Sequence, residues 1–243
     1  MSKTEFGDLS AVFINCSIKK NNKDSHTQKL MNRAIGIMEQ QGVAVENIHA
    51  LDNTIAYGMV KDGKEQGDTD DWPIIQQKIL NADILVLGTP IWLGTKSSIC
   101  TQVIERMYAY SGDRNSKGQY VYYGKTAGCV ITGNEDGAKH CAMDILYAMS
   151  HIGYTIPPQA DSAWLGEAGP GPSYGDSEYA GKALDAPAGY ASDFANRNTT
   201  FMAWNLMHTA RMLKDADGLP AKGNVADDWK NVTNAQNQNP EYR

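Results

Sequence analysis

The sequence lacks a long apolar run, a cluster of basic residues and a signal-like start, and each absence excludes a class of protein. No stretch approaches the roughly 20 apolar residues of a transmembrane helix, and the polar residues 1–8 contain no apolar segment of a signal peptide. Lysine and arginine are scattered through a chain of net charge -6, so nothing marks a surface for nucleic acid or an anionic membrane. We therefore expect a cytoplasmic protein that binds neither.

Cysteine is scarce and is not arranged for metal binding. The four cysteines lie far apart, and no pair has the Cys-x-x-Cys spacing of zinc or iron–sulfur sites. The acidic residues 68–71 lack the glycine and glutamate that complete a calcium loop, and the five histidines are not grouped. We expect no bound metal, and buried thiols at Cys16, Cys100, Cys129 and Cys141.

What the sequence does have is an alternation of short apolar runs and amphipathic segments. Apolar runs that end in polar residues predict buried strands over 11–17, 43–51, 83–89, 126–132 and 154–160. Apolar residues at helical spacing predict helices over 25–42, 73–80, 97–110 and 138–151. This order predicts an α/β protein with a doubly wound, five-stranded parallel sheet, order 2-1-3-4-5, and helices on both faces. That is the flavodoxin-like arrangement.

Local signals define the boundaries of two of these helices. Ser25 and Gln28 form the Ser-x-x-Gln pattern of a capping box, and Gly42 is placed to end the same helix. Pro73 stands where the first position of the second helix is expected.

The C-terminal third departs from the alternation, although we expect residues 1–243 to form a single domain. Residues 164–188 are rich in Gly, Pro and Tyr, which predicts a long ordered loop or an excursion over a site. The tail over 218–243 is polar, and we expect it to cross the surface or a neighbouring subunit. A closing helix is expected over about 190–214, with these residues mostly packing on the sheet: Phe194, Phe201, Met202, Trp204, Leu206 and Leu213.

The loop after the first strand, residues 15–27, is rich in hydroxyls, amides and lysines and leads into a helix. Open parallel sheets bind ligands at the carboxyl ends of their strands, and a helix N-terminus favours a phosphate. Ser17, Ser25 and Thr27 are candidate hydroxyl donors, and Lys19 adds charge. The alternative is that Ser25 only caps the helix and the lysines are solvated.

The loop expected after the third strand, residues 89–94, is apolar and aromatic where connecting loops are usually polar. Pro90 stiffens it, and Gly94 permits an unusual dihedral angle. Trp92 and Leu93 are suited to border a flat ring by stacking and apolar contact. The alternative for Trp92 alone is an aromatic residue of the core or of a dimer interface.

The loop after the fourth strand, residues 132–137, offers backbone amides and the side-chain amide of Asn134 to the polar edge of such a ring. By itself it is equally explained as a strand-to-helix turn with Asn134 or Asp136 as the cap. Only the combination of the three loops at one edge of the sheet is specific, and it predicts a site for FMN.

The three loops resemble those of the NADPH-dependent FMN reductase and multimeric flavodoxin-like quinone reductase family, over about two thirds of the chain. Residues 15–27 are similar to the family's Asn-Gly-Ser-Pro-Arg-x-x-Gly-Asn-Thr phosphate loop, with Cys16 for Gly, Ile18 for Pro and a longer, more basic spacing. Residues 89–94 resemble Thr-Pro-Val-Tyr-x-Gly, and residues 132–134 are similar to the family's third loop.

The resemblance implies that FMN binds at this edge, that NAD(P)H is the electron donor, and that the protein is a homodimer or homotetramer. Ser17, Lys19, Ser25, His26 and Thr27 are placed near the phosphate, Pro90, Ile91, Trp92, Leu93 and Gly94 along the isoalloxazine, and Thr132, Gly133 and Asn134 at its polar edge.

Two functions follow from such a site. The first is an enzyme whose FMN takes electrons from NAD(P)H and passes them to a quinone or other small acceptor by a ping-pong mechanism. The second is a flavodoxin-type FMN electron carrier that docks on protein partners. The modest net charge of -6 and the long C-terminal extension favour the enzyme.

Overall fold

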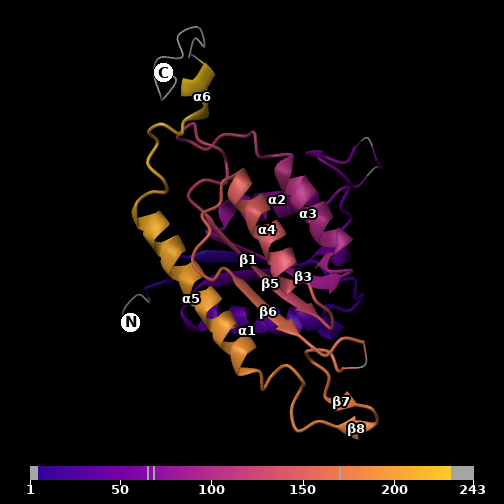
Figure 1. Ribbon diagram of the computed structural model, residues 1–243. Helices are drawn as coiled ribbons and strands as arrows, with labels where there is room; N and C mark the ends of the chain where they lie inside the picture. Colours follow the sequence, from indigo (N-terminus) through magenta and orange to yellow (C-terminus); the bar gives the residue numbers. More distant parts are fainter. Residues whose placement is uncertain (1–4, 65, 68, 170, 231–243) are drawn as a thin grey trace.

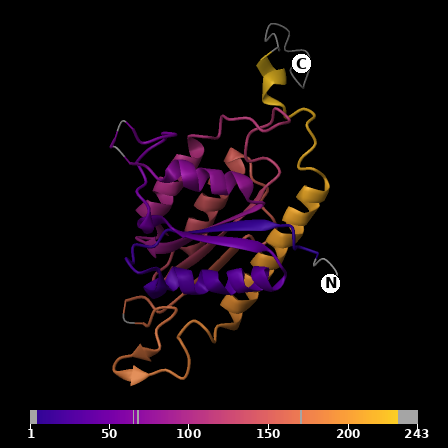
Figure 2. The same ribbon diagram turned by 180° about the vertical axis from the view of Figure 1, so that it is seen from behind.

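The computed structural model describes residues 5–64, 66–67, 69–169 and 171–230, and its centre is a parallel sheet with helices on both faces (Figure 1, Figure 2). The sheet follows the order β2-β1-β3-β5-β6, which confirms the predicted topology because the additional, two-residue β4 pairs only with β3. The strands are β1 (Ser10–Asn15), β2 (Ala44–His49), β3 (Ile84–Trp92), β4 (Thr95–Lys96), β5 (Thr126–Gly133) and β6 (Asp161–Leu165).

The helices form a layer on each face of the sheet. One apolar cluster joins the sheet to α1 and α5, and a second joins it to α2, α3 and α4. These helices are α1 (His26–Gln40), α2 (Trp72–Asn81), α3 (Ser98–Tyr108), α4 (Ala138–Ile152) and α5 (Asp193–Asp215). The short elements are η1 (Asn22–Asp24), η2 (Ala50–Asp52), β7 (Glu178–Tyr179), β8 (Lys182–Ala183) and α6 (Ala226–Lys230).

The register of the central strands brings three loops to one edge. Asn15 at the end of β1 is opposite Gly88 of β3, and Pro90 of β3 is opposite Thr132 of β5. Because all three strands are parallel, the chain leaves them at the same side of the sheet.

The N-cap at Ser25 and the place of Pro73 are confirmed, but the second half of the predicted capping box does not form, because the Gln28 side-chain amide donates to Asn32 Oδ1 instead. The Ser25 hydroxyl oxygen accepts the N–H of Gln28 at 3.1 Å, and the helix it caps ends just before Gly42, whose φ is +89°. Pro73 lies in the first turn of α2. Capping chemistry therefore fixes these boundaries before any tertiary packing is considered.

The predicted fifth strand was placed wrongly. Residues 154–160 form no strand, and only Thr155 makes an isolated bridge to β5. The adjacent Pro157 and Pro158 have no N–H to donate to a ladder, so pairing begins after them, at Asp161.

The closing helix α5 is confirmed, but two of its aromatic residues do not pack on the sheet. Met202, Leu206 and Leu213 are buried as predicted, whereas Phe194 and Phe201 are 59% and 44% exposed. The two phenylalanines are two helical turns apart, so both lie on the same outward face of the helix.

The described part of the tail is docked on the protein. The side-chain amide of Gln119, which is 1% exposed, donates to the carbonyl oxygens of Leu219 and Pro220 and to Asn224 Oδ1 at 3.1–3.3 Å. This contact precedes α6, which projects from the end of the molecule opposite the β7–β8 hairpin (Figure 1, Figure 2). The predicted path of residues 231–243 lies outside the described residues.

A buried ion pair holds the long loop over residues 53–71. Arg106 donates to both carboxylate oxygens of Asp70 at 2.6 and 3.1 Å and to the carbonyl oxygens of Ala56 and Lys61. The Arg106 side chain is fully buried and that of Asp70 is 6% exposed. Burial alone would raise the pKa of Asp70, but the hydrogen bonds from Arg106 and from two backbone amides outweigh it and lower the pKa.

The four cysteines are free and buried, as predicted. In the ranges that the structure describes, no helix combines the length and apolar character that crossing a membrane requires.

Candidate functional site

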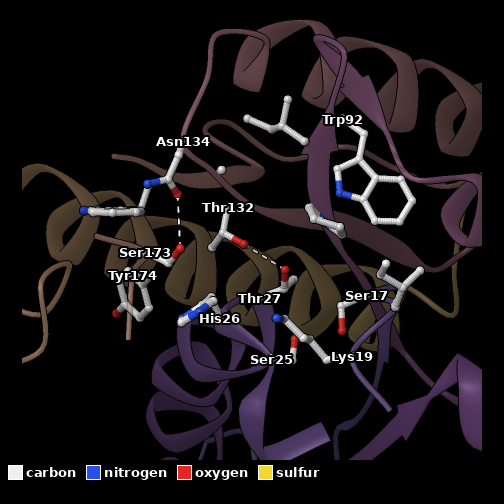
Figure 3. A pocket seen from close by; sticks show the side chains of 15 residues that line it. Ser17, Lys19, Ser25, His26, Thr27, Trp92, Thr132, Asn134, Ser173 and Tyr174 are labelled. Carbon is white, nitrogen blue, oxygen red and sulfur yellow. Dashed lines mark hydrogen bonds between the residues drawn. The ribbon is translucent and has the colours of Figure 1, made fainter. Parts of the chain in front are cut away.

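A cavity of about 320 Å³ opens at the carboxyl ends of β1, β3 and β5 (Figure 3). The chain connections change direction between β1 and β3, which is where open parallel sheets bind ligands. Four segments line the cavity, through Ser17, Ile18, Lys19, Ser25, His26, Thr27, Pro90, Ile91, Trp92, Thr132, Gly133, Asn134, Trp164, Ser173 and Tyr174. Of the described residues, no group of three or more His, Cys, Asp and Glu is placed to hold a metal ion.

The first segment, the loop after β1, is held by the side chain of Asn15. Its Nδ2 donates to Asn22 Oδ1 at 2.6 Å and to Ser25 Oγ at 3.1 Å, and its Oδ1 accepts the N–H of Ser17 at 3.1 Å. Asn15 is fully buried. One side chain thus fixes the loop at three points before any ligand binds.

The hydroxyls of this loop match the needs of a phosphate group. Ser17 Oγ is buried and has no hydrogen-bond partner within the described part of the chain. Leaving a buried hydroxyl unpaired costs roughly 1–3 kcal/mol, which an acceptor on a ligand would offset. Ser25 Oγ accepts two hydrogen bonds and still has its own hydrogen to donate, and Ser25 is the N-cap of α1. Ser17 lines the same cavity. These donors fit the phosphate of a flavin nucleotide.

A hydroxyl pair links the first wall of the cavity to the third. Thr27 Oγ1 and Thr132 Oγ1 are 2.8 Å apart, and both residues are buried (Figure 3). Since Thr27 belongs to α1 and Thr132 to β5, the bond fixes the spacing of the two walls.

The second wall comes from β3, which is longer than predicted. The sequence predicts residues 89–94 as a loop, but β3 continues to Trp92 and turns back into β4. Leu93 and Gly94 form the turn with φ of +49° and +75°, the left-handed conformation that a two-residue hairpin turn requires. Trp92 therefore stands at the edge of the cavity on a paired strand, with 36% of its surface exposed.

Two side chains from the segment after β5 anchor this hairpin. Glu135 Oε1 accepts the N–H of Leu93 at 2.9 Å, and His140 Nδ1 lies 2.9 Å from the carbonyl oxygen of Gly94, to which it donates as the N–H tautomer. Both residues of the turn are thus tied to neighbouring positions, Glu135 in the loop after β5 and His140 in the first turn of α4, and these bonds hold Trp92 in place.

The fourth side is closed by residues 171–176, which we call the wall segment. The Asn134 side-chain amide donates to the carbonyl oxygens of Gly171 and Pro172 at 3.0 and 2.9 Å. Tyr174 is fully buried and packs edge-on against Trp164 with ring centroids 5.7 Å apart. The wall segment is therefore packed as well as hydrogen bonded.

His26 and Lys29 of α1 hold the wall segment from the other side. His26 Nδ1 accepts the N–H of Gly175 at 3.0 Å, and Lys29 Nζ donates to the carbonyl oxygen of Gly175 at 3.2 Å. His26 Nε2 is 3.6 Å from Asp176. Because Nδ1 must be unprotonated to accept, the neutral Nε2–H tautomer is the one that fits.

The bond between His26 and the wall segment should weaken in acid. Burial lowers the pKa of His26, Asp176 opposes this, and Lys29 and Lys19 reinforce it. A histidine with a lowered pKa contributes stability above its ordinary pKa, near 6.5, and loses it as pH falls through the lowered value. We expect the Gly175 amide to become less protected from hydrogen exchange below that range, with His26→Gln showing no such step. Unchanged protection of Gly175 from pH 7 to pH 4.5 would contradict this prediction.

The structure brings together eleven of the thirteen predicted site residues. Leu93 and Gly94 do not line the cavity, because they form the hairpin turn and Leu93 is 95% exposed. Three lining residues had no motif to mark them: Trp164, Ser173 and Tyr174. The only sequence signal for them was the unusual composition of residues 164–188. Asn15 was also missed as the residue that organises the first loop.

A family model described as NADPH-dependent FMN reductase matches residues 10–166. The chain belongs to this family. The match spans β1 to β6 and so contains three of the four walls of the cavity. It confirms the predicted family, and the family's description implies an oxidoreductase that uses FMN and NADPH, as predicted.

Individual relatives extend the similarity beyond the family match. The chain is 32% identical over 213 residues to 8-demethyl-8-aminoriboflavin-5'-phosphate synthase of Streptomyces davaonensis, covering 85% of this chain and 79% of the relative. A crystal structure of RosB with bound 8-demethyl-8-formylriboflavin-5'-phosphate has a TM-score of 0.75 at 32% identity, covering 85% of this chain and 81% of that one.

A third relative is much longer than this chain. It is a Mycobacterium bovis protein described as divalent metal cation transporter MntH, 53% identical over 210 residues. The similarity covers 86% of this chain but 30% of that protein, so the chain spans less than a third of this relative's length.

Proposed function

We propose that this protein is an FMN-dependent oxidoreductase that transfers electrons from NAD(P)H to a quinone or another small acceptor by a ping-pong mechanism. The observation that carries the proposal is the buried Ser17 hydroxyl, which has no partner among the described residues and lines the same cavity as the N-terminus of α1 and an apolar wall. Phosphate donors on one side and a flat apolar surface on the other are what a flavin nucleotide requires. Membership of the FMN reductase family supports the same ligand.

The proposal assigns each wall of the cavity to one part of FMN. Ser17, Ser25, Thr27 and the amides at the start of α1 would hold the phosphate, with Lys19 adding positive charge. Pro90, Ile91 and Trp92 would border the ring, and Thr132, Gly133 and Asn134 would meet its polar edge. His26 is engaged by the wall segment, so we assign it to the wall rather than to the phosphate.

When bound, FMN supplies the hydride and electron chemistry. The protein binds it, orients it and limits access of water. NAD(P)H and the electron acceptor would bind in turn on the side of the cavity between the wall segment and Trp92. Burial raises the pKa of Tyr174, so its phenol stays protonated and acts as packing rather than as a base.

The decisive experiment is an anaerobic reduction. The FMN-loaded protein should lose its flavin absorbance rapidly with NADPH and recover it on addition of benzoquinone. If NADPH left the flavin oxidised while a reductase protein reduced it, the electron-carrier alternative would be favoured. A protein that takes up no FMN would contradict both functions.

A second candidate function treats the flavin as a substrate. It is favoured by the 32% identity to a relative described as 8-demethyl-8-aminoriboflavin-5'-phosphate synthase, at a coverage of 85% of this chain. In that case the chain would modify the flavin chemically instead of cycling it between its oxidised and reduced forms. Mass spectrometry of the flavin extracted after aerobic incubation separates the two, because an oxidoreductase returns FMN of unchanged mass.

We also propose that the chain forms a homo-oligomer in the cytoplasm. Apolar side chains stand on the outer faces of α3 and α4, where Met143 and Tyr147 are 64% and 69% exposed and Tyr108 is 40% exposed. Contiguous exposed apolar surface is typical of protein interfaces. Light scattering should give a multiple of the 26.6 kDa chain mass, and a monomer would contradict this proposal.

A further inference from the structure

Three residues that line the cavity are also exposed to solvent, and they mark its mouth. They are Ile18, Lys19 and Trp92, of which Ile18 and Trp92 are 51% and 36% exposed. Figure 3 shows Lys19 and Trp92 among the side chains that surround the cavity. Among the described residues that line the cavity, none is acidic. The mouth therefore combines apolar surface with positive charge.

Two further lysines extend this charge along the rim. Lys20 and Lys23 follow Lys19 in the loop after β1, and both are exposed. The chain leaves the cavity lining at Lys19 and rejoins it at Ser25. The Cα atoms of Lys20 and Lys23 are therefore at most about 4 and 7 Å from that of a lining residue. Since these distances are within the Debye length of about 8 Å at physiological ionic strength, both charges act at the mouth.

Neither of these two lysines is engaged by a carboxylate. Within the described ranges, the lysines that form ion pairs are others: Lys61, Lys64, Lys78, Lys96, Lys117, Lys139 and Lys214. Residues 18–24 contain three lysines and one acidic residue, Asp24, in a chain of net charge -6. The proposed function uses Lys19 for the FMN phosphate, which leaves Lys20 and Lys23 without a role.

The backbone that carries these lysines is held in place by hydrogen bonds. Asn15 Nδ2 donates to Asn22 Oδ1 at 2.6 Å, and the N–H of Asp24 donates to the carbonyl oxygen of Asn21 at 3.0 Å. The N–H of Lys23 donates to Asn21 Oδ1 at 3.1 Å. Because the loop is ordered in advance, a ligand that meets the lysines does not have to order the backbone.

The hairpin at the mouth has charge of the opposite sign beside it. Glu135 accepts the N–H of Leu93 at 2.9 Å, and both Glu135 and its neighbour Asp136 are exposed. A molecule that lies against Trp92 therefore meets positive charge on the side of the loop after β1 and negative charge on the side of Glu135. This asymmetry favours one orientation of an anionic group.

We infer that Lys20 and Lys23 select reactants that carry a negatively charged group, and that they direct this group toward the loop after β1. The planar part of the reactant lies against Trp92 and Ile18. The inference rests on the proposed function and adds a substrate class to it: a planar acceptor that bears a sulfonate, carboxylate or phosphate group. The phosphates of NAD(P)H share this chemistry, because the donor uses the same place in a ping-pong mechanism. Lys20 and Lys23 are thus specificity-determining residues.

The test compares a charged with a neutral acceptor in the FMN-loaded protein. The probes are 1,4-naphthoquinone-2-sulfonate and 2-methyl-1,4-naphthoquinone, each reduced anaerobically with NADPH. Lys20→Gln with Lys23→Gln should lower kcat/KM for the sulfonate about fivefold relative to the neutral quinone, because two solvated charges are removed. Lys20→Arg with Lys23→Arg keeps both charges and should retain the preference.

A matched control removes the same charge elsewhere. Lys78→Gln with Lys222→Gln changes two lysines that do not line the cavity. Lys78 lies beside Ser10, at the start of β1 and thus at the opposite edge of the sheet, and Lys222 precedes α6. This variant should leave the ratio of the two kcat/KM values unchanged.

The donors provide a second comparison. NADPH carries one phosphate more than NADH, so the variant with Gln at positions 20 and 23 should lose more kcat/KM for NADPH than for NADH if the lysines meet the donor. A changed acceptor ratio with an unchanged donor ratio would support the inference with the charged group on the acceptor. The reverse would support it with the charged group on NADPH.

Ionic strength gives an independent measurement. In the unmodified protein the preference for the sulfonate should decline between about 20 and 300 mM salt, and in the Gln variant it should stay nearly flat. The dissociation constant of FMN should be the same in both. Unchanged ratios for acceptors and donors, or a loss of FMN affinity in place of a changed ratio, would overturn the inference and leave the proposed function intact. If NADPH did not reduce the flavin of the unmodified protein, the proposed function would be contradicted and the inference with it.

Discussion

Ser17→Asp is expected to weaken FMN binding by about a hundredfold or more, which corresponds to roughly 3 kcal/mol. The new carboxylate would lie among the donors assigned to the phosphate, where it occupies their hydrogen bonds and repels the ligand's negative charge. The fold should persist, because Ser17 lines the cavity and its hydroxyl makes no hydrogen bond within the described residues that the substitution would break. The measurement is a fluorescence titration of flavin-free protein with FMN.

Two controls make this result specific to the phosphate. Ser17→Ala removes one donor without adding charge and should cost only about tenfold. Riboflavin, which lacks the phosphate, should bind Ser17→Asp nearly as well as the unmodified protein. Equal losses for FMN and riboflavin in Ser17→Asp would mean that the phosphate is not held at this loop.

Arg106→Met is expected to lower the free energy of unfolding by about 3–5 kcal/mol, the largest stability loss we predict. The substitution leaves the Asp70 carboxylate buried without its partner and also frees the carbonyl oxygens of Ala56 and Lys61. Chemical denaturation would measure the loss, provided that the slope of the unfolding free energy against denaturant concentration is the same in both proteins.

A second buried substitution tests the cause of that loss. Adding Asp70→Asn to Arg106→Met removes the orphaned charge and should restore part of the stability, giving a clear coupling energy in a double-mutant cycle. The surface pair of Lys78 and Glu46 is the matched comparison, and Lys78→Met should cost at most about 1 kcal/mol. Similar losses at the buried and the exposed pair would contradict the assigned role of burial.

The sequence predicts the position of the site well because the alternation of strands and helices and the capping pattern are local properties. Residues that end buried strands must meet at one edge of a parallel sheet, so Ser17, Pro90 and Thr132 were expected together and are together. Ser25 caps α1 as its pattern indicated. None of these conclusions required knowledge of long-range packing.

The errors occur where long-range contacts decide the structure. Leu93 was expected along the ring because it is apolar, but its hairpin is fixed by Glu135, a residue far away in the sequence. The wall segment has no periodicity to indicate which of its residues turn inward, and its place depends on Asn134 and His26. Phe194 shows the same limit, since apolar character alone did not reveal its outward orientation.

The wall segment also bears on how proteins of this kind diverge. The family match ends at residue 166, whereas the wall segment begins at residue 171 and supplies Ser173 and Tyr174 to the cavity. The part of the chain that the family model matches therefore carries the loop after β1, and a stretch beyond that match closes the opposite side of the cavity. Substitutions or insertions in that stretch can reshape the space next to a bound ring without disturbing β1, α1 or the sheet.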